Sequence, residues 1–292
     1  MTRLRPAIAL LCLCLIGCKG ADPEPPISGP KMDAPLPRVV SFTNEDGRQL
    51  SMDLYEPAAE KSVHRIVLLI HGGGWVGGHR SQMSEIGRSL AKAGFLAAST
   101  DYTLANAAAW PTELRDVQAA VRYLRSHASE LKADPKWIGA AGVSAGGHLS
   151  LWLGSVDKPI GGVSSRVQTV VSISGIHDLN SPLTAAGEQY GIVPALMHEK
   201  GRPDRSARRQ ASPIEAASKA TAPTFFVQGK ADPLVPASQS EDAAKRLTAL
   251  GVENRVLMVE GMRHGLNLFA PPEQAAMDEI VTWLKGHLGP VR

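Results

Sequence analysis

The sequence predicts an α/β fold, in which helices cover both faces of a mostly parallel sheet and a small lid is inserted late in the chain. Three observations predict it. Short apolar runs alternate with helical patterns from residue 65 to residue 287, as in a parallel sheet crossed by helices. Residues 65–70 are almost continuously apolar, which is typical of a strand buried on both faces. Residues 176–222 break the alternation, and a structureless loop of that length is rare inside a compact domain.

The chain begins with the features of a secretory signal. Arg3 and Arg5 precede an apolar stretch over residues 7–16, which is too short for the ~20 residues of a membrane-spanning helix. We therefore expect residues 1–17 to be a signal peptide that is removed from the mature protein.

The sequence Leu-Ile-Gly-Cys that ends at Cys18 resembles the lipobox of bacterial lipoproteins. The resemblance implies that Cys18 is lipidated and that the exported chain is anchored to a bacterial membrane, facing the periplasm or the cell surface. Lys19 matches the sorting pattern of Gram-negative outer-membrane lipoproteins. An ordinary secretory signal with an incidental cysteine is the alternative. Because Cys12 and Cys14 lie in the removed segment, the mature chain can form no internal disulfide.

The remaining chain is organised as a tether and a single domain. Residues 18–37 are rich in proline and poor in large apolar side chains, which predicts a semi-extended tether. Residues 38–292 are expected to form one α/β domain, because α/β folds of this size are often single. We expect its lid at about residues 176–222.

Charge and residue spacing exclude some classes of function. The formal net charge of +3 falls to +1 when Arg3 and Arg5 are removed, so no nucleic-acid partner is expected. The basic residues around Asp204 fit a solvated loop; they are Arg202, Arg205, Arg208 and Arg209. No histidine or cysteine spacing suggests a metal site. The oligomeric state does not follow from the sequence.

The strands and helices are expected in the following order. Residues 38–43 and 48–55 alternate apolar and polar side chains around Asn-Glu-Asp-Gly, which predicts an antiparallel hairpin at the edge of the sheet. The other strands are expected over residues 65–70, 95–100, 137–141, 167–174, 224–228 and 255–259. Helices are expected over residues 81–93 and 112–128, after Ser144, and over 238–250 and 273–287.

A Gly-x-Ser-x-Gly sequence occupies residues 142–146, where an apolar strand passes into small, helix-compatible residues. A serine raised on so tight a turn tolerates no side chains beside it, which explains Gly142 and Gly146. Ser144 is therefore the candidate nucleophile.

The sequence HGGGW at residues 71–75 follows the buried strand directly. Consecutive glycines let backbone N–H groups approach a ligand closely. In esterases such a loop supplies one side of the oxyanion hole, and the residue after the nucleophile supplies the other. We expect Gly73, Gly74 and Ala145 to bind the oxyanion, Trp75 to form a wall of the substrate pocket, and His71 to shape the loop.

An acid and a base complete the candidate catalytic set. Asp232 and His264 each follow a separate predicted strand, which gives the chain order Ser, Asp, His found in α/β-hydrolases. Because parallel strands end at the same edge of a sheet, the three side chains can converge there. Three other histidines are weaker candidates for the catalytic base because of their positions. His148 lies in the helix expected after the nucleophile, and His177 and His198 lie in the expected lid. The best rival acid is Asp178.

Together these motifs resemble those of the α/β-hydrolase esterases near hormone-sensitive lipase, especially the bacterial feruloyl- or acetylxylan-esterase-like (BD-FAE-like) branch. HGGGW, GVSAGGH, GKADPLVP and MRHG occur in that group's order and spacing, over roughly residues 39–287. The resemblance implies an α/β-hydrolase fold and catalysis without a cofactor. Val143 and Thr103 stand where relatives of hormone-sensitive lipase usually carry an acid and an arginine, which favours the polysaccharide-ester branch.

The sequence therefore predicts a serine carboxylic-ester hydrolase that acts on short-chain or sugar-linked esters, as small molecules or on polysaccharides. His264 would take the proton of Ser144, and Asp232 would orient the imidazole. Two alternatives stay open: an exopeptidase of the prolyl-oligopeptidase type, which shares the triad and fold, and a non-catalytic surface lipoprotein that uses the fold as a scaffold. Neither the acyl group nor the alcohol follows from the sequence.

Overall fold

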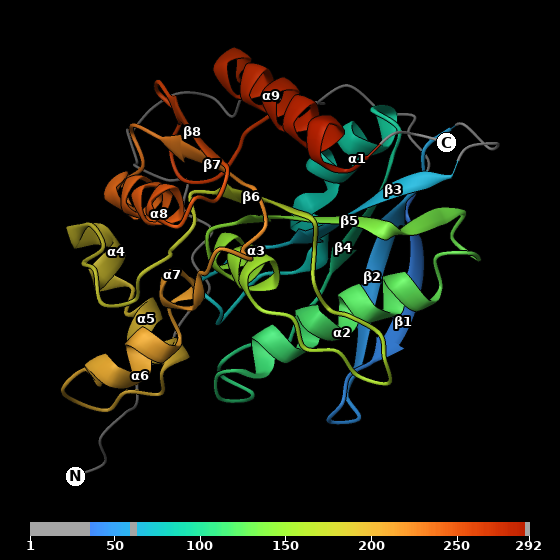
Figure 1. The fold of residues 1–292 in the computed structure, drawn as a ribbon. Coiled ribbons are helices and arrows are strands. Elements are labelled where there is room, and N and C mark those ends of the chain that lie inside the picture. The colour runs from blue at the N-terminus through green and yellow to red at the C-terminus, as the bar shows by residue number, and fades with distance from the viewer. Residues whose placement is uncertain (1–35, 59–62, 290–292) are drawn as a thin grey trace, which may run out of the picture. The chain divides into compact units, whose positions relative to one another are not determined.

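Eight strands form one sheet in the order β1-β2-β4-β3-β5-β6-β7-β8, with helices on both faces (Figure 1). This is a computed structural model, and it describes residues 36–58 and 63–289. The pairs β1–β2 and β2–β4 are antiparallel and the other pairs are parallel. The predicted α/β fold is thus confirmed. The signal peptide over 1–17, the lipidation site Cys18 and nearly all of the tether lie outside the described residues.

The strands and helices agree closely with those expected. The strands are β1 (Arg38–Thr43), β2 (Gln49–Tyr55), β3 (His64–Ile70), β4 (Phe95–Thr100), β5 (Ala133–Val143), β6 (Thr169–Ile173), β7 (Thr224–Gly229) and β8 (Asn254–Val259). The helices outside residues 176–222 are η1 (Arg80–Met83), α1 (Ser84–Lys92), α2 (Thr112–Ser126), α3 (Ala145–Ser155), α8 (Ser238–Ala249) and α9 (Pro271–His287). Two differences are that the helix expected over 81–93 is divided into the 3₁₀ turn η1 and α1, and that β5 begins before residue 137.

The predicted hairpin lies at the edge of the sheet, where its turn is fixed by Asn44. The side-chain oxygen of Asn44 accepts from the N–H groups of Asp46 (3.0 Å) and Arg48 (2.8 Å), and Gly47 takes a positive φ of 76°. The Asn44 amide also donates to the buried carboxylate of Asp116 on α2 (2.5 Å). This bond ties the edge of the sheet to a helix that covers it.

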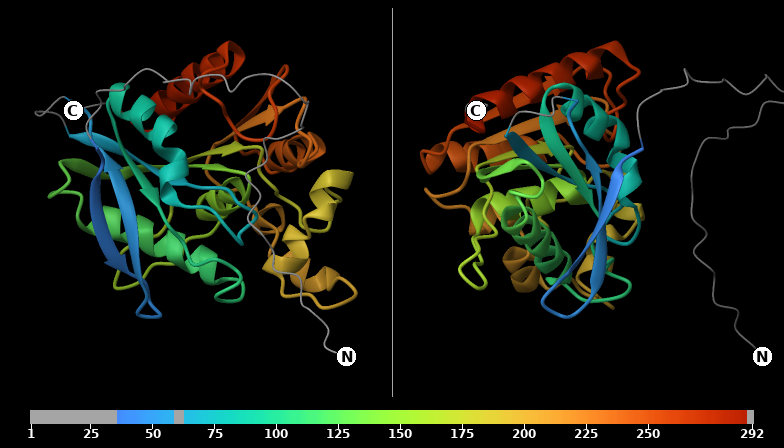
Figure 2. Two further views of the ribbon diagram at one scale, coloured as in Figure 1. Left: turned by 180° about the vertical axis from the view of Figure 1, so that it is seen from behind. Right: turned by 90° about the vertical axis from the view of Figure 1, so that its right-hand side faces the viewer.

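Both faces of the sheet are buried, as the apolar run in β3 predicts. Ile66, Leu68 and Ile70 belong to a core layer with α2 and α3, whereas Val67 and Leu69 pack in a second layer with α1 and α9. The views in Figure 2 show these helices on opposite sides of the sheet. Alternate residues of one strand therefore supply two separate cores, because side chains alternate between the faces of a sheet.

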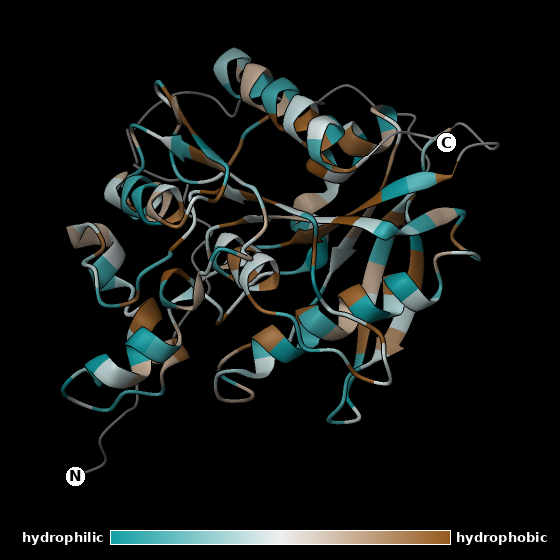
Figure 3. Cartoon of the chain, in the orientation of Figure 1, coloured by the Kyte–Doolittle hydropathy of each residue, from teal (hydrophilic) through white to brown (hydrophobic). Residues whose placement is uncertain are grey.

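The segment over residues 176–222 contains four short helices: α4 (Ala185–Gln189), α5 (Ile192–Leu196), α6 (Arg205–Gln210) and α7 (Pro213–Ala216). Figure 3 shows an apolar α5 beside a mostly polar α6. The ring N–H groups of His148 and Trp152, both on α3, donate to the carbonyl of Ala211 (2.8 and 3.2 Å). The segment is thus packed against the helix that follows the nucleophile. Within the described residues, no helix is both long and apolar enough to span a membrane.

Candidate active site

Ser144 occupies the sharp turn between β5 and α3 and is 5% exposed. Its φ of +55° lies in the left-handed region, which is uncommon for residues with a side chain. A Cβ atom added at Gly142 would lie 2.2 Å from the carbonyl oxygen of Gly146, and one added at Gly146 would lie 2.0 Å from that of Ile70. The glycines on either side are therefore required by backbone packing around the serine.

The backbone of Ser144 is fixed on both sides of the turn. Its N–H donates to the carbonyl of Ile173 at the end of β6 (2.8 Å), and its own carbonyl accepts from the N–H of His148 (3.1 Å). The strained turn is thus held by the neighbouring strand and by the first turn of α3. Such fixed geometry is what a nucleophile on a turn of this kind requires.

His264 and Asp232 form a hydrogen-bonded pair at the ends of β8 and β7. His264 Nδ1 lies 2.9 Å from Oδ2 and 3.1 Å from Oδ1 of Asp232. The two loops are joined directly, because the N–H of Ala231 donates to the carbonyl of Met262 (3.1 Å). The side chain of Asp232 is 1% exposed and that of His264 is 20% exposed, so the carboxylate lies behind an imidazole that reaches the surface.

The surroundings of Asp232 keep its carboxylate ionised. Burial acts to raise its pKa, but the hydrogen bond and charge of His264 and the N–H groups of Val235 and Leu234 outweigh burial, so the net pKa is lowered. Its Oδ1 accepts from the N–H of Leu234 (2.8 Å) and of Val235 (2.9 Å). An oriented, ionised carboxylate of this kind can fix the tautomer of a neighbouring histidine and stabilise its cation.

The loop that carries His264 lies beside the nucleophile turn. A Cβ atom added at Gly265 would be 3.7 Å from Cγ1 of Val143, the residue before Ser144. Among the described residues, no hydrogen bond joins Ser144 to His264. The structure thus joins His264 to Asp232 and brings the loop of His264 next to the turn that carries Ser144. Hydrogen bonds to catalytic bases are commonly long before substrate binds.

The glycine loop after β3 approaches the same serine. A Cβ atom added at Gly72 would lie 3.2 Å from Cβ of Ser144. Gly73 and Gly74 have φ values of +114° and +58°, which favour glycine. Within the described part of the chain, the N–H groups of Gly73, Gly74 and Ala145 donate no hydrogen bond. Free N–H groups beside a serine can bind developing negative charge.

The prediction that Trp75 forms a wall of the substrate pocket is wrong. Its side chain is fully buried and packs edge-on against His148, with ring centroids 5.0 Å apart. Its φ of +62° and the hydrogen bond from Ala105 N–H to its carbonyl (2.8 Å) fix the backbone there, and the ring lies in the core. By contrast His71 shapes the loop, as expected: it stacks on Tyr102, with ring centroids 4.3 Å apart.

The competing histidines are engaged elsewhere. Burial is the main cause that lowers the pKa of His148 to about 4 and that of His177 to about 3. His177 pairs with Ser172 (Nε2 to Oγ, 3.2 Å), and His198 Nε2 donates to the carbonyl of Ala105 (2.6 Å). None of them is paired with a carboxylate among the described residues, in contrast to His264.

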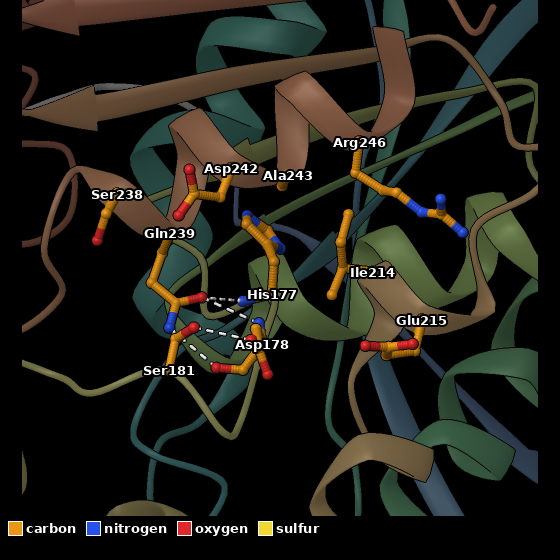
Figure 4. Close-up of a pocket in the computed structure, with 10 residues that line it drawn as sticks. All are labelled: His177, Asp178, Ser181, Ile214, Glu215, Ser238, Gln239, Asp242, Ala243 and Arg246. Atoms are coloured by element: carbon orange, nitrogen blue, oxygen red, sulfur yellow. Dashed lines mark hydrogen bonds between the residues drawn. The ribbon is translucent and has the colours of Figure 1, made fainter. Parts of the chain in front are cut away.

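The rival acid, Asp178, lines a separate cavity of about 430 Å³ between α7 and α8 (Figure 4). Its carboxylate accepts from Ser181 Oγ (2.7 Å) and from the N–H of Asn180 (2.8 Å). Gln239 Oε1 accepts from the N–H groups of His177 (2.8 Å) and Asp178 (3.0 Å). Asp178 thus organises its own loop. In the described ranges, no cluster of three histidine, cysteine or acidic side chains is arranged to hold a metal ion.

Two residues that contact the candidate active site, one at Asp232 and one at the glycine loop, were missed by the sequence analysis. Gln228 Nε2 donates to Oδ2 of Asp232 (3.3 Å) and to the carbonyl of Val235 (3.1 Å). A polar side chain in an otherwise apolar strand was the signal for it. Ile192 of α5 packs on Gly74: a Cβ atom added there would lie 2.6 Å from Cγ2 of Ile192. No periodic pattern in the lid predicts that contact.

The chain is similar to known esterases. The BD-FAE family profile matches residues 52–247. Esterase LipC of Mycobacterium tuberculosis is 29% identical over 215 residues, which cover 70% of this chain and 53% of that protein. The chain spans about half the length of the curated relatives it matches.

Solved structures agree with this similarity. A truncated carbohydrate esterase from gut microbiota is 26% identical, with a TM-score of 0.74 over 87% of this chain and 98% of that chain. An acetyl ester-xyloside bifunctional hydrolase from Caldicellulosiruptor lactoaceticus shares the fold, with a TM-score of 0.75 at 24% identity over 88% of this chain and 100% of that chain. Because the family profile covers well over half of its length, the chain belongs to the BD-FAE family of α/β-hydrolase esterases.

Proposed function

We propose that this protein is a serine carboxylic-ester hydrolase that uses Ser144, His264 and Asp232. The observation that carries the proposal is the His264–Asp232 pair, with Nδ1 2.9 Å from Oδ2. The loop of His264 adjoins the turn of a buried serine at φ +55°. Family membership supports the same class of reaction.

In the proposed mechanism His264 acts first as a base. It takes the proton of Ser144 Oγ as this oxygen attacks the ester carbonyl carbon, and Asp232 stabilises the imidazolium that forms. The tetrahedral intermediate then collapses, the bond to the alcohol oxygen breaks, and the alcohol leaves with the proton from His264. Water attacks the remaining acyl-serine with His264 again as base, which releases the acid and restores Ser144.

The oxyanion of each tetrahedral intermediate would be bound by the N–H groups of Gly73, Gly74 and Ala145. Their lack of other hydrogen-bond acceptors among the described residues supports this role. Donors fixed in advance stabilise the charge that develops in the transition state, and each is typically worth about 3–4 kcal/mol.

We propose short-chain and sugar-linked esters as the substrate class. The structural relatives named as a carbohydrate esterase and an acetyl ester-xyloside hydrolase support this class. The family match favours ester hydrolysis over an exopeptidase or a non-catalytic scaffold. We also propose export and lipid anchoring through Cys18, supported by the lipobox-like sequence. Labelled palmitate should be incorporated into the wild type and not into Cys18→Ser. Equal incorporation into both proteins would contradict lipid anchoring through Cys18.

The test of function is the variant Ser144→Ala, assayed with p-nitrophenyl acetate and with a fluorophosphonate probe. We expect turnover to fall by up to ~10⁶-fold and labelling to disappear, because the nucleophile is lost. The matched control is Ser126→Ala, an exposed serine at the end of α2, which should keep wild-type activity. Unchanged hydrolysis by Ser144→Ala would refute the proposal, and cleavage of aminoacyl-naphthylamides in preference to esters would favour the exopeptidase.

A further inference from the structure

A short stretch of the lid over residues 187–192, here called the strap, contacts the loop of the candidate acid. A Cβ atom added at Gly187 would lie 2.3 Å from the carbonyl oxygen of Leu234. The N–H of Thr184, just before the strap, donates to the same carbonyl (3.2 Å). The N–H of Leu234 in turn donates to Oδ1 of Asp232 (2.8 Å). The first residue of the strap is therefore fixed against the loop that binds the carboxylate.

The other end of the strap contacts the glycine loop. Cγ2 of Ile192 would be 2.6 Å from a Cβ atom added at Gly74. The isoleucine methyl thus packs on a bare glycine whose N–H is a proposed oxyanion donor. Gly191 takes a left-handed conformation, with φ +60°, which turns the chain between α4 and α5. Both ends of the strap are therefore fixed to loops of the candidate active site.

The strand order shows what lies between these two contacts. The glycine loop follows β3 and the acid loop follows β7, and β5 and β6 lie between them in the sheet. These strands are parallel, so all of them end at the same edge. A chain segment that runs from the end of β7 to the end of β3 must pass the ends of β6 and β5. Ser144 lies at the end of β5, so the strap runs past the end of the strand that carries the nucleophile.

Tyr190 lies within the strap and is exposed. Because consecutive Cα atoms are about 3.8 Å apart, its Cα lies within about 7.6 Å of that of Ile192. Its side chain is 63% exposed. The strap thus exposes an aromatic residue two positions before its contact with the glycine loop.

We propose that Tyr190 is the platform on which the alcohol part of a sugar ester rests while its acyl group meets Ser144. The C–H bonds on the face of a pyranose ring carry partial positive charge, and the face of an aromatic ring is electronegative. Stacking on a rim residue would hold the sugar outside the buried serine and leave only the acyl group to enter. This inference rests on the proposed ester hydrolysis and names the part of the substrate that the strap recognises.

The experiment compares two acetate esters that differ in the alcohol. One is an O-acetylated methyl xyloside, and the other is methyl acetate, which has no ring to stack. For Tyr190→Ala we expect KM for the xyloside to rise about 3- to 10-fold with little change in kcat, as for loss of one aromatic contact. KM for methyl acetate should not change. Tyr190→Phe, which keeps the ring, should restore the wild-type KM for the xyloside.

The matched control is Phe269→Ala, which removes a second exposed aromatic side chain (68% exposed) outside the strap. The neighbouring Leu266 and Leu268 pack into the layer of α1 and α9. We therefore expect the KM values of Phe269→Ala for both esters to equal those of the wild type. An unchanged xyloside KM in Tyr190→Ala, or an equal rise for both esters, would overturn the platform while leaving ester hydrolysis intact. Failure of the wild type to cleave either ester would overturn both proposals.

Discussion

Individual buried polar residues differ in how well their neighbours satisfy them. The carboxylate of Asp232 accepts hydrogen bonds from a histidine and from two backbone N–H groups, and its pKa is lowered. Glu113, in the first turn of α2, is fully buried, and neither carboxyl oxygen has a hydrogen bond. Burial raises its pKa to about 7; Asp116 adds to the rise, and the nearby N–H of Glu113 itself acts against it. The protein thus lowers the pKa of one buried carboxyl group and raises that of the other.

Glu113 should make the stability of the fold depend on pH. Its pKa rises from 4.5 to about 7 on folding, so the folded state binds the proton more tightly. The stabilisation is complete below pH 4.5 and is lost as pH rises towards 7. We expect Glu113→Gln to gain up to ~3 kcal/mol relative to the wild type between pH 5 and pH 8. Urea unfolding at both pH values measures the gain.

The control for this prediction is Glu130→Gln, which changes an exposed glutamate shortly after α2. It should leave the pH dependence of unfolding as in the wild type. If Glu113→Gln and the wild type lose stability in parallel between pH 5 and pH 8, the buried carboxyl does not titrate in this range.

At the level of elements, the junction of β5 and α3 is determined by close backbone approach. Gly146 lies against the end of β3: an added Cβ atom would meet the carbonyl oxygen of Ile70 at 2.0 Å and that of His71 at 2.8 Å. Backbone atoms in the centre of a sheet cannot move aside as a flexible side chain can. Gly286 in α9 differs, because nothing lies within 4 Å of an added Cβ atom. Two helical glycines therefore have different reasons to be glycine.

The variants Gly146→Ala and Gly286→Ala should shift stability in opposite directions. Gly146→Ala forces β3 and α3 apart and should destabilise the fold by about 1–3 kcal/mol or more. Gly286→Ala adds helix propensity at an open position and should stabilise it by about 0.5–1 kcal/mol. Guanidinium unfolding of both proteins measures the difference. A stable, fully active Gly146→Ala would contradict the packing described for the nucleophile turn.

Across the described residues, the segment over 176–222, which the sequence predicts to be a lid, is a packed part of the fold. Besides its bonds to α3, it contains an ion pair between Glu199, whose side chain is 6% exposed, and Arg208 (2.6 Å). The guanidinium of Arg208 also donates to the carbonyl of Leu179 (3.3 Å), before α4. Arg208 thus links α6 to the part of the chain that precedes α4. The segment that contains the strap is therefore also held by contacts outside the strap.

Arg208→Ala should loosen the lid. Removing one member of a buried pair leaves an uncompensated charge, which typically costs about 3–5 kcal/mol. We expect faster hydrogen exchange and faster proteolysis within residues 176–222, with less change in the sheet. Lys245→Ala, which breaks an exposed pair with Asp242, should have almost no effect. Exchange rates in the lid that match the wild type would show that the pair does not hold it.

Much of the fold followed from local sequence patterns. The alternation of apolar and polar residues predicted the two strands of the hairpin, and the continuous apolar run predicted β3. Burial on one face of a sheet selects the first pattern, and burial on both faces selects the second. The turn at Ser144 was predictable since only glycine fits beside such a serine. The loops of Asp232 and His264 could be located because each follows a strand, and the hydrogen bond between these residues agrees with that placement.

What only the tertiary structure decided are contacts between segments far apart in the chain. The packing of Ile192 on Gly74, the support of Asp232 by Gln228 and the burial of Glu113 have no local signal. Trp75 was misplaced for the same reason: its position next to the glycine loop suggested a pocket wall, but His148 and the backbone of Ala105 hold it in the core. Periodicity records which side of an element is buried, whereas the partner that buries it is determined only when the elements pack together.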